Sequence, residues 1–177
     1  PSMGDLFAEG TAAVLRGLGW NSEGLPVCDR EALDLGRSVT TGKECLPIIN
    51  IMGEILKHIK HRKNKNEKLV VMMVGAGGCC RVGQYDILVN TMAEKLKLRD
   101  VATLVLTNDD GYAGLGLPFR LGMVKSLYAF DTMDDIRSAI KGMAIDPVEG
   151  MKIWTEEKNK MLASLAKEIK TPFFKQL

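Results

Sequence analysis

The stretch LVVMMV at Leu69–Val74, followed at once by GAGGCCRVGQY at Gly75–Tyr85, decides how this chain is interpreted. A short, continuous apolar run rich in valine is typical of a parallel strand that is covered on both faces. A second run of this kind, VATLVL, lies at Val101–Leu106. Between the two runs, the spacing of Leu88 and Met92 predicts a helix of roughly 14 residues. Strand, helix and strand in this order predict a parallel βαβ unit.

The rest of the chain suggests a larger α/β fold around this unit. Helices are expected from Asp5 to Gly19, after Asp29, behind Pro47, from about residue 118, after Thr132 and after Asp146. A short edge strand is expected within residues 20–27. We therefore predict a three-layer, Rossmann-like domain with a mainly parallel sheet over residues 1–145, and a C-terminal helix over 146–177 that packs on it. Because Met3–Asp5 looks like a loop that leaves a strand, we expect the chain to be a piece of a longer protein, with this loop at the carboxyl edge of the sheet.

Composition narrows the class of protein. The chain has 177 residues, of which 46% are hydrophobic and 26% charged, and its net charge is +2. These values are typical of a globular domain and favour neither a nucleic-acid partner nor a membrane. The expected location is cytoplasmic. Four cysteines are too few for a disulfide scaffold of this length, so metal or redox chemistry has to be weighed against buried thiols.

The glycine loop departs from the phosphate-binding patterns that it resembles. In a dinucleotide fingerprint, Gly75 and Gly77 would be followed by a third glycine where Cys80 stands, and a side chain there obstructs close helix–strand packing. The string GKE around Lys43 lacks the Ser or Thr that would meet magnesium. His58 and His61 lie among lysines at a helix end, where a solvated face is the simpler interpretation than a metal site.

The two adjacent cysteines suit an inorganic group better than a nucleotide. Gly77 and Gly78 free the backbone to wrap around such a group, and Arg81 would favour the thiolate form of Cys79 and Cys80. However, the spacing matches neither a ferredoxin series nor a zinc ribbon. By spacing alone, buried thiols remain the simpler interpretation, and Cys28 is most simply a packing residue.

Four strings occur in order and together carry a resemblance: MGD, LDLGRSVTTGKECLP, GGCCRVGQYD and NDDGYAGLG. The chain resembles acyl-CoA dehydratase activase-related proteins, also called CoA-substrate-specific enzyme activases, in a region similar to the cysteine-bearing subunits of 2-hydroxyacyl-CoA dehydratases. The match covers most of residues 3–130. In that family the two cysteine loops read roughly G-K-E-C-x-P and G-P-C-R-x-G-Q-Y. Cys45 matches the first family cysteine and Cys80 the second, whereas Cys79 replaces the usual proline and Cys28 has no counterpart.

The resemblance implies an iron–sulfur cluster, expected to be 4Fe-4S, with Cys45 and Cys80 as ligands and Cys79 as an extra thiol. Two ligands do not satisfy a four-iron cluster, so the remainder must come from Cys79, another domain of a longer chain or a homologous subunit. Around the cluster, the expected contributors are Lys43, Gly77, Gly78, Arg81, Gln84 and Tyr85. An isolated, air-exposed domain is expected to lack the cluster.

The function expected on this basis is low-potential electron transfer to CoA-thioester chemistry, with an acyl-CoA as a further partner. No residue is assigned a catalytic role, and whether the chain is itself an enzyme stays open. Two alternatives also stay open: a non-catalytic assembly domain with structural cysteines, and a nucleotide- or CoA-binding module of Rossmann-like type.

Overall fold

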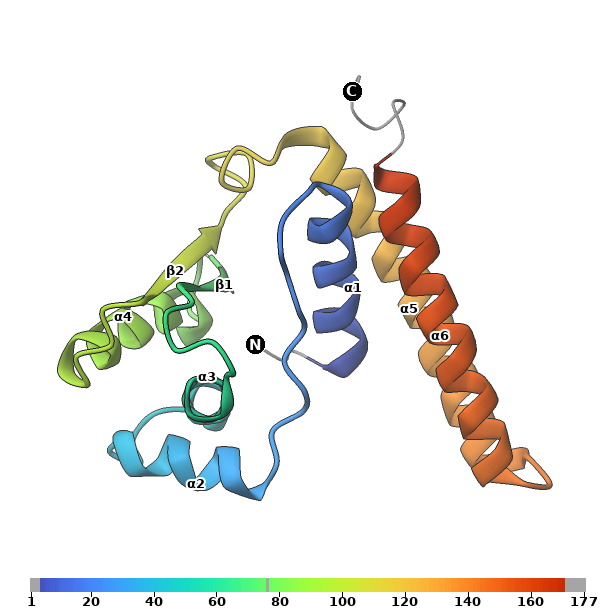
Figure 1. Ribbon diagram of the computed structural model, residues 1–177, viewed down its shortest axis with the longest axis horizontal. Coiled ribbons are helices and arrows are strands. Elements are labelled where there is room, and N and C mark those ends of the chain that lie inside the picture. The colour runs from blue at the N-terminus through green and yellow to red at the C-terminus, as the bar shows by residue number, and fades with distance from the viewer. Residues whose placement is uncertain (1–3, 76, 171–177) are drawn as a thin grey trace. The chain divides into compact units, whose positions relative to one another are not determined.

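The computed structural model describes residues 4–75 and 77–170, which form two compact units. We call Leu25–Gly114 the sheet unit. Residues 4–24 and 115–170 together make the helical unit. Figure 1 shows the elements of both units.

The sheet unit contains six elements. In chain order they are α2 (Arg30–Val39), α3 (Leu46–His61), β1 (Leu69–Val74), the short 3-10 helix η1 (Arg81–Gln84), α4 (Tyr85–Lys95) and β2 (Val101–Leu106). Local chemistry explains two of the helix starts. Asp29 caps α2 by accepting a hydrogen bond from the backbone N–H of Ala32, and Pro47 lies in the first turn of α3, where no backbone donor is needed.

The two predicted strands are confirmed, with the expected bounds and direction. β1 and β2 pair in parallel, with Leu69 opposite Val101 and Val74 opposite Leu106. The crossover between them is η1 and α4, and α4 packs against β2 (Figure 1). The core lies between α3, α4 and one face of β1, and its buried members are Ile48, Ile51, Met52, Ile55, Val71, Met73, Tyr85, Val89 and Met92.

The helical unit is made of α1 (Asp5–Gly17), α5 (Gly116–Met143) and α6 (Pro147–Ile169), each of which packs on the other two. Buried apolar side chains from all three helices fill its centre: Val14, Phe119, Phe130, Leu165 and Ile169. Polar contacts surround this core. Arg137 pairs with Asp5 at 2.6 Å, and the Trp154 indole N–H donates to the backbone carbonyl of Met133 at 2.9 Å.

The prediction of a three-layer, Rossmann-like domain is wrong. Of the described residues, 63% are helical, and they contain two short strands. The two apolar runs do form strands, but the faces of a parallel sheet are covered by helices, and the core with α3 and α4 lies on the face of β1 that carries Val71 and Met73. Val70 on β1 is accordingly 55% exposed, not buried as a central strand would require.

Two further expectations differ from the structure. Residues 20–27 form no strand, and Pro26 lacks the backbone donor that a strand uses. Thr132 does not start a new helix, because α5 continues through it and the Thr132 hydroxyl donates to the carbonyl of Tyr128 one turn earlier. Of the Met3–Asp5 segment, Met3 lies outside the described residues, while Asp5 begins α1.

Candidate functional site

Cys45 occupies the residue just before α3, at the end of the loop that contains Lys43. Its backbone is extended, and the carbonyl of Cys45 accepts the first hydrogen bond of the helix, from the N–H of Ile48. The loop itself is braced by Glu44, whose carboxylate accepts from the backbone N–H of Thr41 at 3.0 Å. These local contacts hold Cys45 at the N-terminus of a 16-residue helix.

The sulfur of Cys45 makes its contact with a residue 40 positions later. The Cys45 Sγ and the Tyr85 hydroxyl share a hydrogen bond of 2.9 Å. Tyr85 is the first residue of α4, and its side chain is only 8% exposed. Burial, together with the hydrogen bond to Cys45 and the nearby negative charges of Cys45 and Cys80, raises the pKa of Tyr85 to about 12. The phenol is therefore a neutral group at physiological pH.

Cys80 and Arg81 lie near Tyr85. Both act on Tyr85 through their charges, Cys80 raising the pKa of the phenol and Arg81 lowering it. Arg81 also reaches the other loop directly, because its Nη1 donates to the backbone carbonyl of Lys43 at 3.3 Å. The structure thus brings together the loop before α3 and the loop after β1, with two thiols, a guanidinium and a phenol between them.

The other residues predicted for the site have no described contact with Cys45 or Tyr85. Cys79 is exposed. Gly78 has a φ of +113°, a conformation that suits glycine, whereas a Cβ on Gly77 would meet nothing within 4 Å. Gln84 is the last residue of η1 and precedes α4. These residues line the loop, but the structure gives them no contact with Cys45.

The donor set for a metal is incomplete within the described part of the chain. In residues 4–75 and 77–170, no group of three Cys, His, Asp or Glu side chains is arranged to hold a metal ion. Two thiols near one phenol are half of the four ligands that a 4Fe-4S cluster requires. The residues present therefore fit such a cluster only as part of a larger ligand set.

The glycine loop differs in geometry from a dinucleotide site. The N–H of Gly75 donates to the carbonyl of Leu106, and a Cβ on Gly75 would lie 2.4 Å from Cγ2 of Thr107. This glycine therefore serves close packing of the two loops that follow β1 and β2. Beyond it, Cys80 precedes a 3-10 turn, and α4 begins only at Tyr85. The α-helical N-terminus that would face a phosphate in a dinucleotide site is displaced along the chain.

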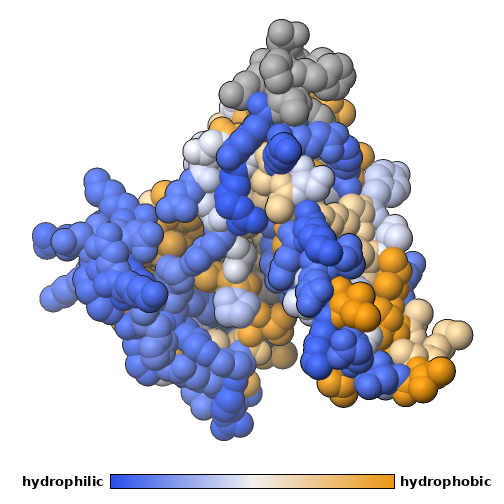
Figure 2. All heavy atoms as spheres, turned by 45° about the vertical axis from the view of Figure 1, so that its right-hand side comes forward, coloured by the Kyte–Doolittle hydropathy of each residue, from blue (hydrophilic) through white to orange (hydrophobic). Residues whose placement is uncertain are grey.

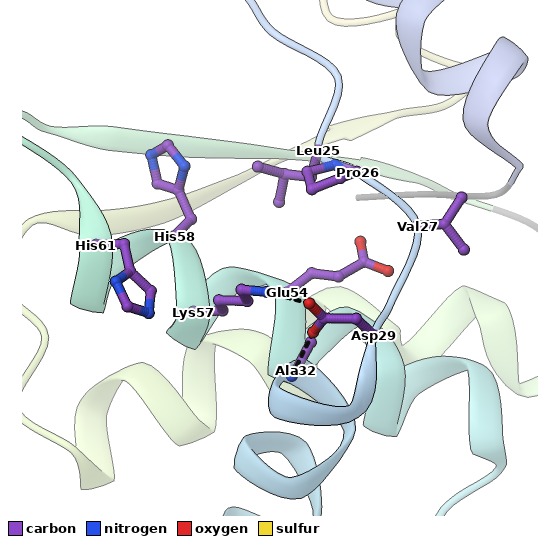
Figure 3. A pocket seen from close by; sticks show the side chains of 9 residues that line it. All are labelled: Leu25, Pro26, Val27, Asp29, Ala32, Glu54, Lys57, His58 and His61. Atoms are coloured by element: carbon purple, nitrogen blue, oxygen red, sulfur yellow. Dashed lines mark hydrogen bonds and ion pairs between the residues drawn. The ribbon is translucent and has the colours of Figure 1, made fainter.

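A second feature, a pocket of about 190 Å³, was not expected from the sequence. Figure 3 shows it between the extended segment at Leu25–Val27 and helices α2 and α3, and its other lining residues are Asp29, Ala32, Glu54, Lys57, His58 and His61. Asp29 forms an ion pair with Lys57, and His61 contacts Glu31 at 2.9 Å. The signal that could have revealed the pocket is Glu54, a carboxylate within the apolar face of α3 that is only 5% exposed.

Cys28 is half-buried and stands in the chain between Val27 and Asp29, two residues that line this pocket. Burial raises the pKa of its thiol, and the charges of Glu54 and Asp29 act in the same direction. A thiol held in its neutral form behaves as a small apolar side chain.

Comparison of the chain with protein-family models, with curated proteins and with solved structures found no match. Among the described helices, none is long and apolar enough to cross a membrane.

Proposed function

We propose that this chain is an iron–sulfur-cluster-binding domain of a protein related to the CoA-substrate-specific enzyme activases. In this proposal Cys45 and Cys80 are two of the cluster ligands, and the other ligands come from outside the described residues. The observation that carries the proposal is the hydrogen bond between Cys45 and Tyr85, because it joins the two loops in which the family resemblance places cysteine ligands.

The charges around the two thiols support this assignment. Iron–sulfur clusters are bound by thiolates, so the protein has to stabilise negative charge at both sulfurs. Cys45 stands at the start of α3, and Arg81 follows Cys80 directly and is tied to the Cys45 loop through the carbonyl of Lys43. When bound, such a cluster would supply one-electron chemistry at low potential, and we propose an acyl-CoA as the acceptor side of that transfer.

Cys79 is the natural control within the same loop. It is adjacent to Cys80 and is also exposed, but it stands where the family pattern has proline, whereas Cys80 matches a family cysteine. Of the two neighbouring thiols, we therefore assign Cys80 to the site together with Cys45.

Iron and sulfide content after anaerobic reconstitution of the intact protein tests the proposal. We expect Cys45→Ala and Cys80→Ala each to abolish iron uptake, while Cys28→Ala and Cys79→Ala leave it unchanged. Normal iron content in the first two variants would contradict the proposal. A colourless protein whose melting temperature rises with CoA or a nucleotide would instead indicate a nucleotide- or CoA-binding module.

A second candidate function, assembly, is favoured by apolar side chains at the turn between α5 and α6. Met143 is 85% exposed, Val148 is 70% exposed, and Ile145 is fully exposed. Figure 2 shows hydrophobic residues gathered at this end of the hairpin. If the domain serves assembly, Ile145→Asp should weaken its association with the other parts of the intact protein without changing iron content, and size-exclusion chromatography would measure the difference.

A further inference from the structure

Tyr85 is the contact that fixes the direction of the Cys45 sulfur. The Tyr85 ring belongs to the buried core of the sheet unit, together with Met52, Val71 and Val89. A ring packed on several sides has little rotamer freedom, so the position of its hydroxyl is set by the core and not by the loop. The hydroxyl lies 2.9 Å from the Cys45 Sγ.

We propose that Tyr85 is a positioning residue for Cys45, donating a hydrogen bond to its sulfur and holding that sulfur in the orientation in which it binds metal. This inference rests on the proposed function. A metal-bound thiolate carries no proton, so only the phenol can donate in that state. Hydrogen bonds to cluster sulfurs withdraw negative charge from them, which is one of the means by which a protein sets the reduction potential.

The hydrogen bond from Tyr85 should also lower the reactivity of the Cys45 thiolate in the metal-free protein. A thiolate that accepts a hydrogen bond is a weaker nucleophile than a free one, because part of its charge is engaged. Removing the hydroxyl alone, in Tyr85→Phe, keeps the ring in the core and should therefore make Cys45 react faster with an alkylating agent. Tyr128→Phe is the matched control, because it makes the same chemical change at a side chain that is 75% exposed on α5.

The first experiment measures alkylation of each cysteine by iodoacetamide, followed by mass spectrometry of the peptides, in the folded metal-free protein. The rate is followed from roughly pH 7 to pH 11 and compared at its plateau, where the thiol is ionised in both variants, so the comparison reports nucleophilicity and not protonation. We expect Tyr85→Phe to speed alkylation of Cys45 several-fold and to leave Cys28 and Cys79 unchanged. Tyr128→Phe should change none of the rates.

The second experiment measures the reduction potential of the reconstituted intact protein. We expect Tyr85→Phe to shift the potential to more negative values at unchanged iron content. Failure of the proposed function would appear as absent iron in the wild-type protein, and the alkylation result would still stand. The positioning role is overturned if Cys45 alkylation is the same in Tyr85→Phe and wild type, or if all cysteines accelerate together, which would indicate a loosened fold.

Discussion

The hydroxyl of Tyr85 lies 2.9 Å from the sulfur of Cys45, although 40 residues separate them in the chain. One partner begins α4 and the other precedes α3, so the contact depends on how these two helices pack around β1.

Stability should fall at high pH because of Tyr85. Its pKa is raised from 10.0 to about 12 in the folded protein, so the fold keeps a proton that the unfolded chain releases. The contribution is fully present below pH 10 and is lost as pH rises toward 12, by at most about 1.4 kcal/mol per pH unit. Urea unfolding across this range should show a steeper decline for the wild type than for Tyr85→Phe. Equal slopes would show that the phenol does not retain its proton.

Gly53→Ala should destabilise the sheet unit. Helices α2 and α3 approach so closely that a Cβ on Gly53 would lie 1.8 Å from the carbonyl oxygen of Ala32. Backbone cannot yield as a flexible side chain does, so we expect a loss of about 1–3 kcal/mol in the free energy of unfolding, or more. In the control Gly142→Ala on α5, the added methyl meets nothing within 4 Å, and the free energy should rise by up to about 1 kcal/mol. Urea denaturation of both variants measures the contrast, and a neutral Gly53→Ala would contradict the close helix packing.

Acid should weaken the contact between α2 and α3 through Glu31. Hydrogen bonds from Lys60 and His61 lower the pKa of this carboxyl from 4.5 to about 2. The folded state therefore releases a proton more readily than the unfolded chain. Its stabilisation is present above pH 4.5 and is lost as pH falls toward 2. Comparing Glu31→Gln with the wild type by acid titration should show a difference at neutral pH that disappears near pH 2 and shrinks in high salt. A difference that persists at pH 2 would contradict this origin.

Asp146→Ala should loosen the start of α6. The Asp146 carboxylate accepts hydrogen bonds from the backbone N–H groups of Val148 and Glu149, both at 3.0 Å. Loss of an N-cap of this kind costs about 1 kcal/mol. Asp135→Ala, an exposed change in the interior of α5, should cost little by comparison. Thermal unfolding followed by circular dichroism would show the difference, and equal melting temperatures would rule out a capping role.

Local patterns were sufficient for the βαβ unit. The runs at Leu69–Val74 and Val101–Leu106 predicted strands with the observed bounds, because continuous β-branched and apolar residues favour extended backbone in any context. Asp29 and Pro47 likewise marked helix starts, since capping and the missing proline N–H act within one turn.

Local sequence patterns did not predict the number of strands in the sheet or the length of helix α5. Thr132 has the chemistry of a helix cap, yet its hydroxyl finds the carbonyl of Tyr128 and α5 continues, because a hydroxyl can satisfy either arrangement. The sequence of an apolar strand is also the same whether one other strand or several lie in its sheet. The two runs therefore predicted a larger sheet than the two-stranded one that the structure shows.

For the candidate site, local patterns were enough to identify the side chains that could bind a cluster: Cys45 before a helix, and Cys79 and Cys80 beside Arg81 in a glycine-rich loop. Which of these side chains meet depends on the packing of the helices and strands behind the two loops. The packing of Tyr85 with α3 and β1 directs its hydroxyl to Cys45 and places it close enough to Cys80 for the charge of that thiolate to raise the pKa of the phenol. Contacts between distant loops depend on how the helices behind them fill a shared core, and local spacing carries no information about that volume.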